Sequence, residues 1–130
     1  MKRITVLLAD DSTLIREALC EVLADEDDME VVGEAATGRQ ALRLTRTLFP
    51  DVVVMDISMP LLSGLEAMRQ IHRTVPSVKV LILSAHSDRA YVEQAAMQGA
   101  AGYVVKQTAA EVLPKAIRDV HRGGRYVMSR

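Results

Sequence analysis

The sequence predicts an α/β fold in which a parallel sheet is covered by helices on both faces. Short runs of aliphatic residues without polar alternation recur along the chain, as expected of strands that are buried on both faces. The segments between them carry apolar residues every three or four positions, which is the spacing of one helix face. Strands that alternate with helices in this way form parallel sheets.

Length and composition indicate one globular domain. The chain has 130 residues, of which 49% are hydrophobic and 25% charged, so we expect a packed core and not a disordered chain. The net charge of −1 is not the footprint of a nucleic-acid-binding surface, and the single cysteine, Cys20, excludes a disulfide framework within the chain. No apolar run approaches the ~20 residues that span a bilayer. The N-terminus is basic and then apolar, but its apolar part is too short for a signal peptide and is followed directly by Asp10 and Asp11. We therefore expect neither a membrane span nor a signal peptide, and we place the protein in the cytoplasm.

The first two units begin with expected strands at residues 4–9 and 29–36. Ser12 can cap the first helix. Thr37 stands three residues before Gln40, in the pattern of a capping box that opens the second helix. The first helix is expected to bury one face, which carries Ile15, Ala18, Leu19, Val22 and Leu23.

The third and fourth units begin with expected strands at residues 52–56 and 78–83. Ser63 and Glu66 repeat the capping-box spacing at the start of the third helix. The fourth helix, at about residues 88–98, should be weakly held because its best apolar face is small, with Tyr91, Val92, Ala95 and Ala96.

The fifth unit begins with an expected strand at residues 102–105, and its helix ends at Gly123 and Gly124. Proline is tolerated in the first turn of a helix, so Pro114 either places the start of the last helix near Val112 or distorts its opening turn. Five such units match the doubly wound, flavodoxin-like (βα)5 sandwich, from which we take the strand order 2-1-3-4-5.

Chemically related side chains stand at the carboxyl ends of four expected strands, namely Asp10 and Asp11, Asp56, Ser84 and Lys106. Parallel strands place these ends at one edge of the sheet, and strands 1 and 3 are neighbours in the expected order, so the three aspartates should converge. Three carboxylates repel one another unless a cation lies between them, and an oxygen-only site suits Mg²⁺. A lysine and a hydroxyl beside them can bind phosphate oxygens, so the set indicates a site that forms an aspartyl phosphate.

In these residues and the motifs around them, the sequence resembles the receiver domains of response regulators in two-component signalling. The matching motifs extend over nearly the whole chain: the Asp10-Asp11 pair, Met55-Asp56-Ile57-Ser58-Met59-Pro60 with Gly64, Ser84-Ala85, and Tyr103-Val104-Val105-Lys106. The stretch at residues 99–103 and the ending at residues 123–126 are most similar to the NarL/FixJ (LuxR-type) branch.

The resemblance implies a role for each site residue. Asp56 would accept a phosphoryl group from a sensor histidine kinase, and Ser84 and Lys106 would bind the phosphoryl oxygens. Tyr103 is implied to swing inward when Ser84 moves. The implied Mg²⁺ ligands are Asp11, Asp56, the backbone carbonyl of Ser58, and Asp10 through a water molecule.

The same resemblance implies a phosphoacceptor switch that is not an enzyme. We expect residues 1–123 to form the receiver and residues 124–130 to begin a linker to a helix-turn-helix output domain that these 130 residues do not contain. The expected output is transcription regulation, with a homodimer formed on phosphorylation and DNA bound only through the output domain. The alternative is a stand-alone or degenerate receiver that acts through protein contacts.

A Mg²⁺-dependent phosphohydrolase with an aspartyl nucleophile is a further alternative. Such enzymes usually carry an acid/base residue two positions after the nucleophile, whereas Asp10 is followed by Asp11 and Ser12, and no insertion is present to form a substrate cap. A nucleotide-binding site is not supported either, because the sequence has neither a glycine-rich turn after the first strand nor a G-x-x-x-x-G-K-[ST] motif.

Overall fold

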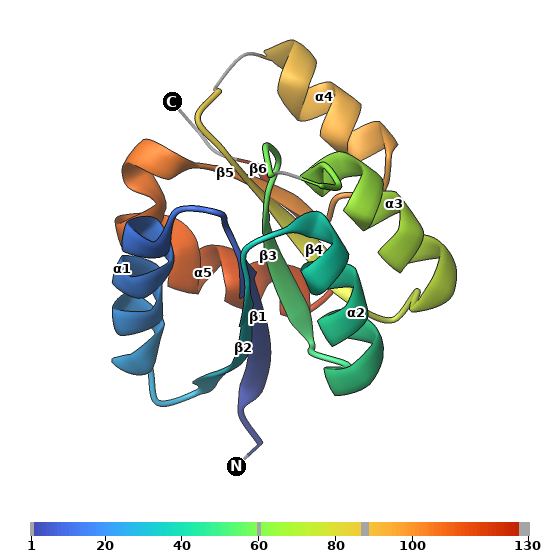
Figure 1. Cartoon of the computed structure of the whole chain (residues 1–130). Helices are drawn as coiled ribbons and strands as arrows, with labels where there is room; N and C mark the ends of the chain where they lie inside the picture. Colours follow the sequence, from blue (N-terminus) through green and yellow to red (C-terminus); the bar gives the residue numbers. More distant parts are fainter. Residues whose placement is uncertain (1, 60, 87–88, 128–130) are drawn as a thin grey trace.

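The computed structural model describes residues 2–59, 61–86 and 89–127, along which strands and helices alternate (Figure 1). The strands are β1 (Ile4–Ala9), β2 (Met29–Ala35), β3 (Val52–Asp56), β4 (Lys79–Ser84), β5 (Gly102–Val105) and β6 (Tyr126–Val127). The helices are α1 (Thr13–Ala24), α2 (Gly38–Leu48), α3 (Gly64–Thr74), α4 (Arg89–Met97) and α5 (Ala109–His121), with a 3₁₀ turn at Lys106–Thr108 before α5. The expected helix start at Asp88 and the motif residue Pro60 lie outside the described residues.

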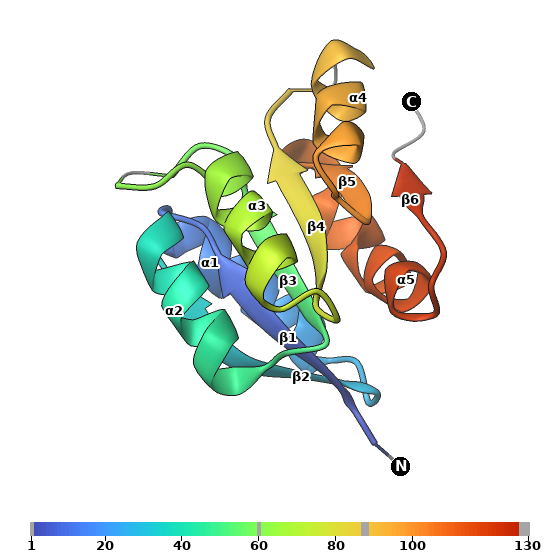
Figure 2. The ribbon, with the colours of Figure 1, turned by 90° about the vertical axis from the view of Figure 1, so that its right-hand side faces the viewer.

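The strands form one parallel sheet in the order β2-β1-β3-β4-β5-β6. Figures 1 and 2 show this sheet between two helical layers, with α1 and α5 on one face and α2, α3 and α4 on the other. The predicted fold class and the predicted order of the first five strands are therefore confirmed. None of the described helices is long and apolar enough to cross a membrane.

Two apolar cores hold the layers together, because successive side chains of a strand point to opposite faces of the sheet. In β1, Leu7 packs with the layer of α2, α3 and α4, whereas Val6 and Leu8 pack against α1 and α5. The central strand β3 is buried at all five of its residues, as its unbroken aliphatic run predicts. Because β1, β3, β4 and β5 run parallel, their polar carboxyl ends lie at one edge of the sheet.

The predicted caps form, but both capping boxes differ from the expected pattern, and in the second of them the Glu66 carboxylate accepts from Arg69 and Gln70. The hydroxyls of Ser12, Thr37 and Ser63 accept hydrogen bonds from the backbone amides at the starts of α1, α2 and α3. The Gln40 side chain accepts from the Ala36 amide, one residue before the position that a standard capping box uses. The prediction that Ala18 belongs to the buried face of α1 is wrong, because this residue is exposed.

The last helix departs from the prediction at its start. It begins at Ala109, so the expected start near Val112 is wrong, and Pro114 lies inside the helix. Proline cannot donate a hydrogen bond to the carbonyl four residues before it, which here belongs to Ala110. Ala110 is exposed, so water can hydrate that carbonyl, while Ala109 and Leu113 are buried against the sheet.

A sixth strand, which the sequence analysis did not predict, extends the sheet. The backbone of β6 runs parallel to β5, with Gly102 opposite Tyr126 and Tyr103 opposite Val127. The chain therefore returns to the sheet edge after α5.

Candidate functional site

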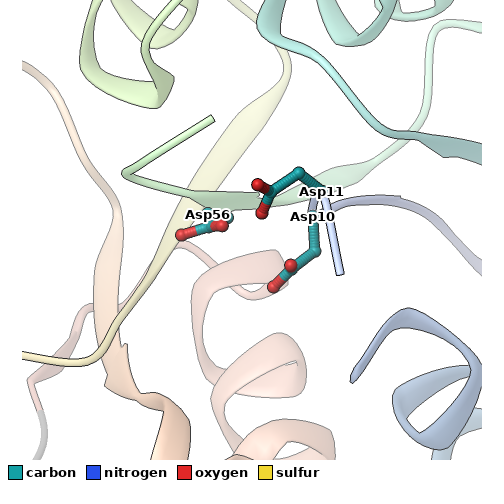
Figure 3. Close-up of side chains that lie close together, drawn as sticks. All are labelled: Asp10, Asp11 and Asp56. Carbon is teal, nitrogen blue, oxygen red and sulfur yellow. The ribbon is translucent and has the colours of Figure 1, made fainter. Parts of the chain in front are cut away.

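The three aspartates lie together at the carboxyl ends of two neighbouring strands. Asp10 and Asp11 follow β1, Asp56 ends β3, and the two strands pair in parallel with Ala9 opposite Met55. One carboxylate oxygen from each aspartate lies within 4.8 Å of the other two, and Figure 3 shows the Asp11 carboxylate facing Asp56. Asp10 and Asp56 are each 2% exposed, whereas Asp11 is exposed. The chain therefore forms an acidic pocket with a buried base and an open rim.

Each buried carboxylate has one well-bonded oxygen and one without a hydrogen bond. The Oδ1 atom of Asp10 accepts from the Ser12 amide at 2.8 Å, and Oδ1 of Asp56 accepts from the Ser58 amide at 3.2 Å. Neither Oδ2 atom has a hydrogen-bond partner in the described part of the chain. The Lys106 ammonium nitrogen lies 3.2 Å from both Oδ2 atoms, at ion-pair distance. The pocket base thus carries two close carboxylates around a single ammonium group.

The electrostatics of the pocket base follow from this crowding. Burial raises the pKa of Asp56 above its ordinary value and repulsion from Asp10 adds to the rise, against the opposing effects of the Ser58 amide and Lys106. Burial lowers the pKa of Lys106, but attraction from Asp56 and Asp10 outweighs it and leaves the pKa raised. The raised pKa of Lys106 reflects the two carboxylates around it, and the repulsion between Asp10 and Asp56 shows that one ammonium does not fully offset their charge, so the pocket suits an additional cation.

Ser84 and Tyr103 are joined through the loop that follows β4. Ser84 is fully buried, and its hydroxyl accepts a hydrogen bond from the His86 amide at 3.0 Å. The Tyr103 hydroxyl donates to the His86 carbonyl at 2.8 Å, and its ring is 2% exposed. The His86 ring is exposed and stacks on Tyr91, with ring centroids 4.5 Å apart. A continuous set of contacts therefore runs from Ser84 at the sheet edge to β5 and α4.

Gly64 brings the start of α3 against the backbone of Asp56. Its amide donates to the Ile57 carbonyl at 3.1 Å. A Cβ atom at this position would lie 2.0 Å from the Asp56 carbonyl oxygen, far inside van der Waals contact. Glycine is therefore required where the loop after β3 folds back on the pocket.

The structure adds Arg16, which the sequence analysis did not single out. Its Nη1 atom donates to the Asp10 carbonyl at 2.6 Å, and its Nε atom donates to Glu34 on β2 at 2.9 Å. The available signal was a cationic residue one helical turn after the cap Ser12, close in sequence to the acidic pair. The contact to a backbone carbonyl leaves no pattern in the sequence, and neither does the role of the His86 carbonyl.

Comparisons with known proteins agree with this geometry. Residues 6–118 match the family model of the response regulator receiver domain. The chain is 42% identical over 126 residues to the response regulator UvrY of Escherichia coli K12, with 97% of this chain and 58% of the relative covered. It is 40% identical over 125 residues to the transcriptional regulatory protein DegU of Brevibacillus brevis, with 96% and 53% covered.

A solved structure is similar over almost the whole chain. The crystal structure of a LuxR-family two-component response regulator from Aurantimonas superposes with a TM-score of 0.92 at 34% identity, covering 98% of this chain and 91% of that one. By contrast, the chain spans little more than half the length of the curated relatives UvrY and DegU.

Proposed function

The chain belongs to the receiver domains of response regulators, in their NarL/FixJ (LuxR-type) branch, and from this premise we propose that Asp56 accepts a phosphoryl group from a sensor histidine kinase. The observation that carries the proposal is the position of Asp56. Its carboxylate is buried beside two further aspartates, with the Lys106 ammonium 3.2 Å from its Oδ2 atom. Membership of this family makes the protein a phosphoacceptor switch and not a conventional enzyme.

The proposed transfer step moves one phosphoryl group between two side chains. A carboxylate oxygen of Asp56 forms a bond to phosphorus while the P–N bond of the donor phosphohistidine breaks. The electron pair of that bond stays on the imidazole nitrogen, which takes up a proton from solvent. Lys106 and the Ser84 hydroxyl are proposed to bind oxygens of the transferred group, since an ammonium and a hydroxyl both donate to phosphate oxygens.

We further propose that the acidic pocket binds Mg²⁺ through the carboxylates of Asp11 and Asp56, the Ser58 carbonyl, and Asp10 through water. The donor set fits, because three carboxylates offer oxygens within 4.8 Å, and the two buried Oδ2 atoms have only the ion-pair contact with Lys106 among the described residues. When bound, the metal neutralises the negative charge shared by the carboxylates and the incoming phosphoryl oxygens. The contribution of the protein itself is to hold the carboxylate of Asp56, which supplies the acceptor oxygen, in place.

Ser84 and Tyr103 are proposed to carry the signal away from the pocket. A phosphoryl group adds about −1.5 to −2 charges and three acceptor oxygens, which attract the Ser84 hydroxyl and Lys106. Ser84 already holds the His86 amide, while Tyr103 holds the His86 carbonyl, so a shift of Ser84 acts directly on the anchor of Tyr103. The weakly buried α4, in which Ala95 alone is fully buried, is the element that can reposition at low cost.

The output is proposed to be transcription regulation through a DNA-binding domain outside these residues. The proposal is supported by the relative DegU, which is named a transcriptional regulatory protein and is about twice as long as the matched region. In this proposal residues 1–123 form the main body of the receiver, and residues 124–130, which include the edge strand β6, lead to the output domain. Phosphorylation is proposed to promote a homodimer. The alternative remains a stand-alone or degenerate receiver that acts through protein contacts.

Intact-mass spectrometry after incubation with Mg²⁺ and acetyl phosphate tests the acceptor. The parent chain should gain one phosphoryl adduct, Asp56→Asn should gain none, and omission of Mg²⁺ should abolish labelling. Asp27→Asn is the matched control, because Asp27 is an exposed aspartate outside the pocket, and it should label like the parent. An adduct on Asp56→Asn at the parent level would overturn the assignment, as would an unlabelled parent under conditions that label another receiver.

Sedimentation velocity tests the homodimer. The phosphorylated parent should sediment as a dimer at concentrations where the unphosphorylated chain and Asp56→Asn remain monomeric. An unchanged monomer after complete phosphorylation would contradict the dimer and favour the stand-alone alternative.

A further inference from the structure

Within the described part of the chain, no contact of its own side chain fixes the direction of the Asp11 carboxylate. Its carboxylate faces Asp56 in Figure 3, yet it makes no hydrogen bond or ion pair with another residue in the described part of the chain. Asp10, by contrast, is held by its side chain, through Ser12, and by its amide, which donates to the Ala35 carbonyl at 2.9 Å. The pocket therefore depends on the conformation of the Asp10-Asp11 peptide to point its exposed carboxylate inward.

Arg16 holds that peptide by its carbonyl. Its Nη1 atom donates to the Asp10 carbonyl at 2.6 Å, and its side chain is only 15% exposed, although arginine is usually a surface residue. The peptide group is planar, so fixing the direction of the Asp10 carbonyl also fixes the amide and the Cα atom of Asp11. A charge-assisted hydrogen bond of this length is among the stronger ones available to a protein.

Glu34 anchors the same guanidinium to the sheet. It lies on β2, opposite Leu8 of β1, and accepts from Arg16 Nε at 2.9 Å. The planar guanidinium can donate to the carboxylate and to the carbonyl at once, whereas a lysine ammonium offers no such fixed fork. The Asp10-Asp11 peptide is thereby tied to two strands and to α1.

We propose that Arg16 is a positioning residue for the metal site, which it serves by orienting Asp11 through the Asp10 carbonyl. The inference rests on the proposed function, because Asp11 is there proposed to bind Mg²⁺. Residues that orient metal ligands from outside the coordination sphere typically contribute about 10- to 100-fold to metal affinity. We expect Arg16 to act at the lower end of this range, about tenfold, because it acts through the backbone.

The direction in which Mg²⁺ affinity changes when Arg16 is replaced distinguishes a positioning role from a purely electrostatic one. Arg16 is a cation close to a cation site, so its charge alone disfavours Mg²⁺, and removing it should strengthen binding if charge were its only influence. Positioning predicts the opposite, because a loosened Asp11 has to be ordered again when the metal binds. A purely structural brace would change the stability of the fold and leave the affinity of the folded protein unchanged.

Titration with Mg²⁺ alone, without a phosphodonor, tests the proposal. Amide chemical shifts of Asp11 and Ser12 report the dissociation constant in the parent, Arg16→Met, Arg16→Lys and Glu34→Gln, and circular dichroism confirms that each variant is folded. Arg16→Met should bind Mg²⁺ about tenfold more weakly, and Arg16→Lys should recover part of the loss through its single ammonium. Glu34→Gln is the matched control, because it keeps the bond to the Asp10 carbonyl, and it should stay within about twofold of the parent.

Three outcomes would overturn the proposal. Arg16→Met could bind Mg²⁺ as tightly as the parent or more tightly, which would leave only a structural or electrostatic role. Glu34→Gln could lose as much affinity as Arg16→Met, which would assign the effect to the ion pair and not to the carbonyl contact. A parent that binds no Mg²⁺ would instead refute the metal site of the proposed function, and the inference with it.

Discussion

Replacement of Lys106 by methionine removes the ammonium that lies between the two buried carboxylates. Its nitrogen is 3.2 Å from one oxygen each of Asp10 and Asp56, whose side chains are 3% and 2% exposed. At an effective dielectric constant of about 20, each such contact corresponds to about 5 kcal/mol of attraction. Desolvation of the lysine, which is 22% exposed, offsets a large part of this sum. We expect a net loss of about 3 kcal/mol in the free energy of unfolding, as for other broken buried pairs.

Urea unfolding followed by circular dichroism, at neutral pH with EDTA, measures this loss. The matched control is Lys115→Met, because Lys115 pairs with Asp119 on the surface of α5 at 2.8 Å, with 72% of the lysine side chain exposed. Solvent screens such a pair, so the control should leave the unfolding midpoint almost unchanged. Added Mg²⁺ should narrow the gap between Lys106→Met and the parent, since it neutralises the same carboxylates.

Equal unfolding curves for Lys106→Met and Lys115→Met in EDTA would refute the reasoning. That result would mean that the buried carboxylates do not depend on the ammonium for their charge balance.

Three further predictions concern the pocket and its surroundings. Burial, with repulsion from Asp10, raises the pKa of Asp56, so the folded state binds this proton more tightly than the unfolded state, and the contribution of Asp56 to metal-free stability should fall as the pH rises from about 4 to neutrality. In urea unfolding, Asp56→Asn should therefore gain stability relative to the parent between these two pH values, and a constant difference between the two proteins would contradict the pKa direction. Gly64→Ala places a Cβ atom 2.0 Å from the Asp56 carbonyl oxygen, so it should lower the free energy of unfolding by about 2 kcal/mol and weaken Mg²⁺ binding. An unchanged free energy of unfolding would show that the loop after β3 is not constrained at this position. Burial and the nearby Glu34 raise the pKa of the Cys20 thiol to about 11. Iodoacetamide at pH 8 should therefore alkylate the folded chain on the order of a hundredfold more slowly than the chain unfolded in urea, and similar rates would contradict the raised pKa.

The sheet and its acidic edge could be predicted because burial leaves a clear pattern in the sequence. The aliphatic run of β3 is buried at all of its positions, and it ends in Asp56 at the base of the pocket. In β1, five of the six residues are buried and Asp10 follows the strand, and parallel topology then brings the two strand ends together. Burial of the strands on both faces thus predicts a parallel sheet, and the parallel direction of the strands predicts where the site lies.

The remaining features depend on backbone contacts, which side-chain patterns do not encode. The strand β6 is two residues long and pairs with β5 through the backbone. Arg16 and Tyr103 reach the carbonyls of Asp10 and His86, and any residue type at those two positions would offer the same acceptor. The start of α5 was mispredicted because the rule against interior proline takes no account of an exposed carbonyl that water can hydrate.

Identification of the phosphorylated residue tests the central claim most directly, because three carboxylates lie within 4.8 Å of one another. Borohydride reduces an aspartyl phosphate to homoserine, which marks the acceptor in a peptide mass spectrum. After treatment of the chain with Mg²⁺ and acetyl phosphate, homoserine should be found at position 56 and not at position 10 or 11. Homoserine at either of the latter positions would contradict the assignment of Asp56 as the phosphoacceptor. So would unmodified aspartate at position 56 after reduction of a sample whose intact mass showed complete phosphorylation beforehand.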